Sequence, residues 1–128
     1  MNTPLKNISN YLKTLGKKWQ PNGGKQKVKG IWDGRNFNLR YFAEYPYVAI
    51  LGEFVLDGPE TRERTGEEIY TYLVELDSKE QARCYYRWNQ VGSDSMMRIL
   101  DTNTGICVAE WYSADKFVNK DERNRSKL

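Results

Sequence analysis

The chain has 128 residues, of which 39% are hydrophobic and 29% charged, with a formal net charge of +3 and no histidine. This length suits one domain that buries roughly two-thirds of its unfolded surface, and it excludes two full domains. With no histidine, two cysteines and no glycine-rich phosphate loop, the sequence excludes histidine-assisted catalysis and structural zinc, and we expect no metal and no cofactor.

Charge is unevenly distributed along the chain. Residues 1–32 contain seven lysines and neither Asp nor Glu, whereas the other 13 of the 20 basic residues share the rest of the chain with all 17 acidic residues. The first quarter therefore carries +7 and the remainder −4. This layout predicts a basic N-terminal arm at 1–24, a single α+β body at 25–118 and a basic C-terminal tail at 119–128.

The arm begins with a predicted helix. Apolar residues recur there at helical spacing, at Leu5, Ile8, Leu12 and Leu15. Thr3 followed by Pro4 is typical of an N-cap with proline in the first turn, and Gly16 is typical of a helix end. We therefore expect a short helix over residues 4–15. Residues 20–24 have the Pro, Asn and Gly content of a hinge.

The body is expected to open with a β-hairpin. Asp33-Gly34 suits the type I′ turn between strands at 27–32 and 35–41. Two further apolar runs rich in β-branched and aromatic residues are predicted strands, at 47–56 and 69–76. Residues 60–68 between these runs are mostly charged, which indicates an exposed loop.

Residues 78–89 fit two secondary structures. As a strand they alternate, with Ala82 and Tyr86 on one face and Arg83 and Arg87 on the other. As a helix they begin with a capping box formed by Ser78 and Gln81, and their charged residues gather on one face. Because the cap and the amphipathic face agree independently, we predict a helix and keep the strand as the alternative.

The chain is predicted to end with a second hairpin and a helix. Residues 96–101 and 106–112 read as strands joined by a turn at 102–105, and Ser113 is a candidate cap for a short helix through about Asp121. The fold class predicted is α+β, with a predominantly antiparallel sheet of about six strands. If residues 78–89 form a strand, the alternative is a seven-stranded antiparallel meander or barrel.

The lysine-rich arm is the first candidate binding site. Lysine neutralises phosphates and releases counterions, and a flat ring such as that of Tyr11 or Trp19 can stack on a base. The residues predicted to bind an anionic partner are Lys13, Lys17, Lys18, Trp19, Lys25, Lys27 and Lys29. The competing interpretation is a solvated surface whose helix packs Leu12 and Leu15 on the sheet.

A second candidate anion site consists of Arg83, Tyr85 and Arg87. On either secondary structure the two guanidinium groups share a face, where they could hold a phosphate or a carboxylate with bidentate geometry. The competing interpretation is a solvated helix face on which Arg83 pairs with Glu80, three positions earlier.

An enzymatic alternative rests on Asp57 and on Asp77-Ser78-Lys79, which follows an apolar strand. Two carboxylates that hold Mg²⁺, with a lysine that polarises the attacked phosphate, are the chemistry of metal-dependent nucleases. The pattern resembles the carboxylate and acid-x-Lys arrangement of the restriction-endonuclease-like family. In that family the acid-x-Lys element lies inside a strand, whereas Asp77 here is expected in the turn after one.

The sequence predicts a non-enzymatic binding module that docks its arm on an anionic partner, with nucleic acid or a ribonucleoprotein first. The alternative is a protein-interaction or inhibitor domain that grips an acidic protein surface or a second copy of itself.

No segment has the roughly 18 apolar residues of a membrane span, so we expect a cytoplasmic protein that does not contact a membrane. The C-terminal Ser126-Lys127-Leu128 matches a peroxisomal address, which is the alternative location. Cys84 and Cys107 are expected to be reduced and buried.

Overall fold

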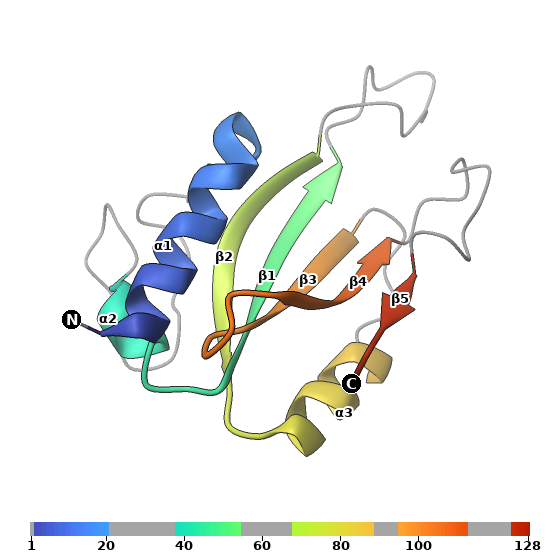
Figure 1. Cartoon of the computed structure of the whole chain (residues 1–128). Coiled ribbons are helices and arrows are strands. Elements are labelled where there is room, and N and C mark those ends of the chain that lie inside the picture. Colours follow the sequence, from blue (N-terminus) through green and yellow to red (C-terminus); the bar gives the residue numbers. More distant parts are fainter. Residues whose placement is uncertain (1, 21–37, 55–67, 89–94, 113–123) are drawn as a thin grey trace, which may run out of the picture.

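The computed structural model describes residues 2–20, 38–54, 68–88, 95–112 and 124–128. The described part has an α+β fold in which helices lie against an antiparallel sheet (Figure 1). Its elements in chain order are α1 (Thr3–Leu15), the 3-10 turn η1 (Gly16–Lys18), α2 (Leu39–Phe42), β1 (Tyr47–Phe54), β2 (Glu68–Leu76), α3 (Lys79–Trp88), β3 (Ser95–Asp101), β4 (Cys107–Tyr112) and β5 (Arg125–Ser126).

The sheet is open and has five strands in the order β2-β1-β3-β4-β5 among the described residues. Each neighbouring pair is antiparallel. The α+β class and the mostly antiparallel sheet are therefore confirmed. In this described part the predictions of about six strands and of a seven-stranded barrel are wrong, because the sheet has five strands and is not closed.

Part of the strand expected at 35–41 is helical instead. Leu39–Phe42 forms α2, and the side chain of Asn38 caps it by accepting a hydrogen bond from the N–H of Arg40 at 3.1 Å. Phe42 is fully buried against α1 and the sheet, and this packing favours the helical turn over the strand. The partner strand at 27–32 and the Asp33-Gly34 turn lie outside the described residues.

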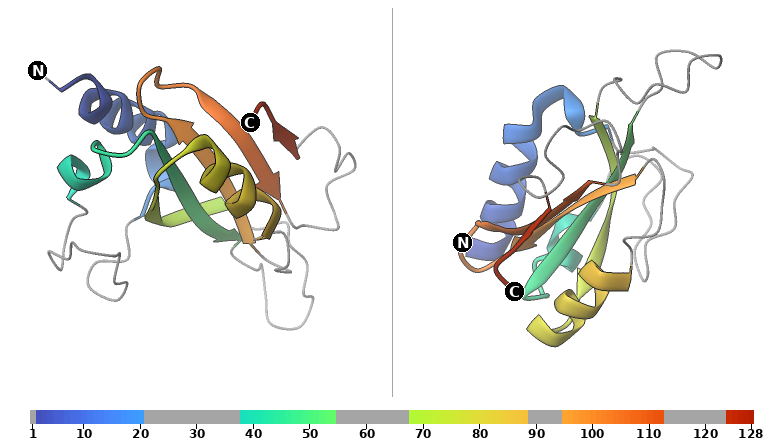
Figure 2. Two further views of the ribbon diagram at one scale, coloured as in Figure 1. Left: turned by 90° about the horizontal axis from the view of Figure 1, so that it is seen from below. Right: turned by 90° about the vertical axis from the view of Figure 1, so that its right-hand side faces the viewer.

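The helices pack on opposite faces of the sheet (Figure 2). On one face α1 and α2 cover a core that includes Ile8, Leu12, Leu15, Phe42, Val48, Ile50, Tyr70, Leu73, Met96 and Leu100. On the other face α3 covers a smaller core that includes Ala49, Leu76, Ala82, Met97, Ile99, Ala109 and Trp111. The sheet therefore has an α1 face and an α3 face, each with its own apolar cluster.

Helix α1 matches its predicted length within one residue. Its N-cap is Asn2 and not Thr3, because the Asn2 side chain accepts a hydrogen bond from the N–H of Leu5 at 3.2 Å. The predicted stop is confirmed, since Gly16 follows the last helical residue with φ of 56°, a backbone conformation that favours glycine. The side chain of Asn7 ties the helix to the β3–β4 turn, where it donates to the carbonyl oxygens of Thr102 and Asn103.

Helix α3 confirms the predicted helix at 78–89. The hydroxyl of Ser78 accepts a hydrogen bond from the N–H of Gln81 at 3.0 Å, as a capping box requires. The Gln81 side chain reaches back one residue further than expected and accepts from the N–H of Asp77. Only Ala82 of this helix is fully buried, so α3 depends more on its cap than α1 does.

The remaining predicted strands are largely confirmed. Residues 47–54 and 69–76 lie in β1 and β2, and the second hairpin is formed by β3 and β4. The predicted exposed loop at 60–68 is wrong at Glu68, which begins β2 with a side chain that is only 12% exposed. The other residues of that loop, and the predicted helix at 113–121, lie outside the described residues.

A β-bulge interrupts the pairing of β1 with β2 between Leu51 and Gly52. A Cβ atom placed on Gly52 would lie 2.3 Å from the carbonyl oxygen of Ile69, so only glycine allows this approach of the two backbones. At the other edge of the sheet, β5 pairs with β4, and the N–H of Lys127 donates to the carbonyl oxygen of Val108 at 2.8 Å. Leu128 packs against the apolar cluster of the α3 face.

A candidate anion-binding surface

The outer face of α1 carries a row of lysines. Lys6, Asn10, Lys13 and Lys17 are exposed and are spaced by three or four residues, so they share one face of the helix and its 3-10 extension. Residues 2–20 contain no acidic side chain. Within the described part of the chain, Lys6, Lys13 and Lys17 form no ion pair. We call these three residues the lysine row.

Lys18 lies apart from this row because it is partly neutralised. Its Nζ atom is 3.6 Å from Oε2 of Glu68 at the start of β2, and its side chain is 52% exposed. Glu68 also faces Arg98, whose Nη2 atom lies 3.8 Å from the same oxygen. Lys18 therefore ties the end of the arm to the sheet, and Glu68 partly compensates its charge.

The two aromatic residues of the arm face the protein. Trp19 is half-buried, packs against the core of the α1 face and forms a parallel bridge with Tyr70 of β2. Tyr11 is also half-buried, and its hydroxyl accepts a hydrogen bond from Nη1 of Arg98 at 3.0 Å. Their rings are held by these contacts, which leaves the lysines as the exposed charged groups of α1.

Three further lysines predicted to bind the partner, Lys25, Lys27 and Lys29, lie outside the described residues. The lysine row itself includes Lys6, which the sequence prediction of site residues left out. Helical spacing was the available signal, since Lys6 lies seven residues before Lys13, on the same face of a two-turn segment.

The structure separates the members of the second candidate anion site. Arg83 and Arg87 are exposed on α3, and Nη2 of Arg87 lies 4.0 Å from the sulfur of Cys84. Tyr85 instead packs against the core of the α3 face. Burial is the main cause that raises the pKa of this phenol to about 12. The two arginines share their surface with Lys79 and Glu80, so the outer face of α3 has mixed charge.

The two candidate sites lie on opposite sides of the molecule. Helix α1 packs on one face of the sheet and α3 on the other (Figure 2). A single flat partner surface would therefore meet one site or the other. Because α1 presents one sign of charge and α3 both signs, α1 is the stronger candidate for a polyanion.

Beneath α1 lies a polar cluster that the sequence did not predict. Arg98 on β3 donates three hydrogen bonds to phenolic oxygens of the α1 face, to Tyr70 at 2.8 Å, Tyr11 at 3.0 Å and Tyr112 at 3.1 Å. Its Nη1 atom also lies 3.4 Å from Oε1 of Glu110. A lone arginine in the apolar run of residues 96–100 was the only available signal, and its partners come from three distant segments.

This cluster positions the lysine row. Tyr11 belongs to α1, so its hydrogen bond with Arg98 joins the helix to the middle of the sheet. Burial is the main cause that raises the pKa of the phenols of Tyr11, Tyr70 and Tyr112, which keeps them neutral around the guanidinium group. The helix is therefore held by both apolar and polar contacts on its inner side, with its lysines outward.

The residues of the enzymatic alternative are only partly described. Asp77 and Lys79 are exposed at the start of α3, where Asp77 lies in the turn before the helix, and Asp57 lies outside the described residues. Among the described ranges, no three His, Cys, Asp or Glu side chains form a group that could hold a metal ion. Cys84 and Cys107 are free thiols, and both are half-buried where full burial was expected.

Comparison of the chain with protein-family models, with curated proteins and with solved structures finds no match. The helices in the described part of the chain lack the length and apolar character of a membrane span. The fold and the surface thus define a small single-domain α+β protein whose clearest surface feature is a lysine row on its N-terminal helix.

Proposed function

We propose that this protein is a non-enzymatic binding module that docks the lysine row of α1 on an anionic partner, with nucleic acid as the first candidate. The observation that carries the proposal is that Lys6, Lys13 and Lys17 are exposed on one helix face and form no ion pair with any described residue. Protein surfaces normally mix both signs of charge, so a helix face of one sign calls for a partner of the other.

The chemistry of the row suits a phosphate backbone better than a single small anion. Lys6 and Lys13 are seven residues apart, about 10 Å along the helix, and Lys17 extends the row by roughly another turn. Separated point charges neutralise several phosphates of a polymer and release their counterions. Lysine contacts to phosphate position a protein without reading bases, so we expect binding with little sequence preference.

The packing of α1 makes the row a fixed surface. Ile8, Leu12 and Leu15 are buried on the inner side of the helix, and Tyr11 bonds to Arg98. A partner therefore meets charges already in place on a folded helix, and binding does not have to order the helix first.

The test is binding of a fluorescent oligonucleotide by anisotropy at low salt, with the full chain and a triple variant, K6E/K13E/K17E. We expect the triple variant to lose binding by at least about a hundredfold, since each reversal replaces an attraction with a repulsion of roughly 1 kcal/mol. The control is R83E/R87E on α3, which lowers the net charge by four units on the opposite face, against six in the triple variant, and is expected to keep most of the affinity.

Equal losses in the triple variant and the control would show that net charge alone acts, and would contradict a docking surface on α1. If the full chain ignores oligonucleotides but associates with acidic proteins or with itself in a salt-dependent way, the partner assignment is wrong. The protein-interaction alternative then takes its place.

A further inference from the structure

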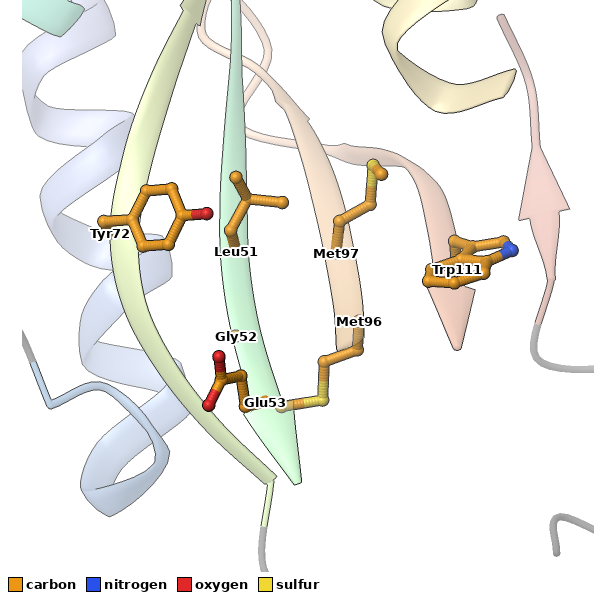
Figure 3. Close-up of a pocket in the computed structure, with 7 residues that line it drawn as sticks. All are labelled: Leu51, Gly52, Glu53, Tyr72, Met96, Met97 and Trp111. Carbon is orange, nitrogen blue, oxygen red and sulfur yellow. The ribbon is translucent and has the colours of Figure 1, made fainter. Parts of the chain in front are cut away.

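A pocket of about 110 Å³ opens on the α3 face of the sheet, away from the lysine row. Helix α3 follows the end of β2 and lies near the start of β1 (Figure 1). The pocket lies further along β1, where Leu51, Gly52 and Glu53 of its C-terminal half line it (Figure 3). The pocket has an apolar floor and a polar rim, a combination typical of ligand sites. Nothing in the proposed binding by α1 uses this pocket.

The floor is a row of side chains that cross four strands at one level. Leu51 of β1 pairs directly with Tyr72 of β2 and with Met97 of β3, and Met97 pairs with Trp111 of β4. Figure 3 shows these side chains across the sheet in the order Tyr72, Leu51, Met97 and Trp111, with an aromatic ring at each end. Met97 and Trp111 are buried, whereas Leu51 and Tyr72 are half-buried. The pocket therefore opens toward β1 and β2.

The rim on that open side carries a negative charge. Glu53 lies two residues beyond Leu51 on β1, is exposed, and turns its carboxylate toward β2, the strand of Tyr72 (Figure 3). Of the described residues that line the pocket, Glu53 alone is charged. Burial, followed by the nearby charge of Glu53, raises the pKa of the Tyr72 phenol, which is consistent with a carboxylate close to the ring.

These features select the class of ligand. A carboxylate at the rim disfavours anions, whereas aromatic rings and a thioether attract a cation that also has apolar surface. A cavity of roughly 150 Å³ holds one benzene ring, so this smaller pocket has room for an alkyl group of about four or five carbons. We infer that the pocket binds a small alkylammonium group, with the alkyl part on Leu51, Met97 and Trp111 and the cation between Glu53 and the ring of Tyr72.

The affinity expected for such a ligand is modest. It has about five or six non-hydrogen atoms and therefore few contacts from which to gain affinity, so Kd is expected on the order of 1 mM. Nuclear magnetic resonance measures binding in this range, and the methyl group of Met97 and the indole N–H of Trp111 report directly on the floor of the pocket.

The experiment titrates the full chain with isoamylammonium chloride, with sodium chloride added to hold the ionic strength constant. Parallel titrations use isoamyl alcohol and isovalerate, which keep the branched alkyl group but are neutral and anionic. We expect saturable shifts at Met97 and Trp111 with the ammonium ion, weaker shifts with the alcohol and none with the carboxylate.

Two variants and a control sharpen the assignment. Glu53→Gln is expected to weaken ammonium binding about three- to fivefold, the effect of a partly exposed ion pair, and to leave binding of the alcohol unchanged. Leu51→Phe fills the pocket and is expected to abolish the shifts. The control Glu44→Gln removes an exposed carboxylate beside α2, outside the pocket, and is expected to change neither titration.

Absence of shifts at Met97 and Trp111 with all three probes would overturn the assignment of a ligand site. Equal affinity for the ammonium ion and the alcohol, or the same loss in Glu53→Gln and Glu44→Gln, would overturn the assignment to a cation. Because the pocket and the lysine row lie on opposite faces of the sheet, these outcomes are independent of whether α1 binds nucleic acid.

Discussion

Helices α1 and α3 are both amphipathic and lie on opposite faces of the same sheet, yet they differ in how they are held and in what they present. Helix α1 buries Ile8, Leu12 and Leu15 and bonds to Arg98 through Tyr11. Helix α3 fully buries only Ala82. Outward, α1 shows lysines without acids, whereas α3 shows both signs of charge.

Amphipathicity alone does not identify a binding helix in this protein. Both helices satisfy the same periodicity, and each has a basic residue near its C-terminal end. The differences that matter are the sign pattern of the outer face and the rigidity supplied by the inner face. On both counts α1 is better suited than α3 to meet a polyanion.

The largest expected effect on stability comes from removal of the polar cluster beneath α1. Arg98→Met would remove three hydrogen bonds to phenols and leave Glu68 and Glu110 with only the more exposed Lys18 and Arg125 as opposite charges, so we expect a cost of about 3–5 kcal/mol. Urea denaturation followed by circular dichroism measures the change. Tyr112→Phe is the control, because it removes one hydroxyl and is expected to cost about 1 kcal/mol. Equal costs would show that the charges of the cluster are solvent-screened.

The next largest loss of stability is expected from truncation of the apolar face of each helix, and this loss should be larger in α1 than in α3. Ile8→Ala in α1 removes a fully buried side chain, which costs about 2–5 kcal/mol. Cys84→Ala in α3 removes a half-buried thiol and is expected to cost less than about 1 kcal/mol. The same denaturation experiment compares them. A larger loss of stability in the α3 variant would contradict the conclusion that α1 depends more on buried side chains than α3.

The helix caps are expected to matter in the opposite order, so that loss of the cap affects α3 more than α1. Asn2→Ala and Ser78→Ala each remove a capping acceptor worth about 1 kcal/mol. Since α3 has little buried surface, loss of its cap is expected to open it locally, whereas α1 should stay protected by its core contacts. Amide hydrogen exchange distinguishes the two outcomes. Faster exchange throughout α1 in Asn2→Ala would contradict the account.

The smallest effect on stability near neutral pH is expected from the buried tyrosines on both faces of the sheet. Burial raises the pKa of Tyr11 and Tyr70 on the α1 face, and that of Tyr85 on the α3 face to about 12. The unfolded chain loses its phenolic protons near pH 10, before the folded protein does. The stability that the protein gains by keeping these phenols protonated is therefore complete below pH 10, and it is lost as pH rises through 10 toward 12 and above.

Urea midpoints measured between pH 8 and pH 12 test this dependence. A flat profile up to about pH 9.5 followed by a steady fall is expected. Constant stability through pH 12 would show that the phenols titrate alike in the folded and unfolded states.

The local features of the fold were predictable from sequence, and the long-range ones were not. Helix α1 follows from the spacing of Leu5, Ile8, Leu12 and Leu15, and α3 from the Ser78 and Gln81 cap, because these signals act within a few residues. Helix α2 was missed because burial of Phe42 by distant segments overrides its strand-like sequence. The bulge at Gly52 likewise depends on the approach of Ile69.

The candidate surface was predictable only in part, for the same reason. The charge imbalance located the lysines, and helical spacing could have added Lys6. Which lysines stay available depends on tertiary contacts, since Glu68 reaches Lys18 only through the folded sheet. The inward positions of Tyr11 and Trp19 depend on Arg98 and Tyr70, which lie more than 50 residues away in the sequence.

The most direct test of the lysine row is the salt dependence of oligonucleotide binding. The logarithm of the affinity of the full chain for duplex DNA is measured against the logarithm of the salt concentration, and compared with K6Q/K13Q/K17Q. Each phosphate contact contributes about 0.9 to the slope, so the triple variant is expected to lower its magnitude by roughly 2 to 3. An unchanged slope, or binding by the full chain that does not depend on salt, would contradict docking through the lysine row.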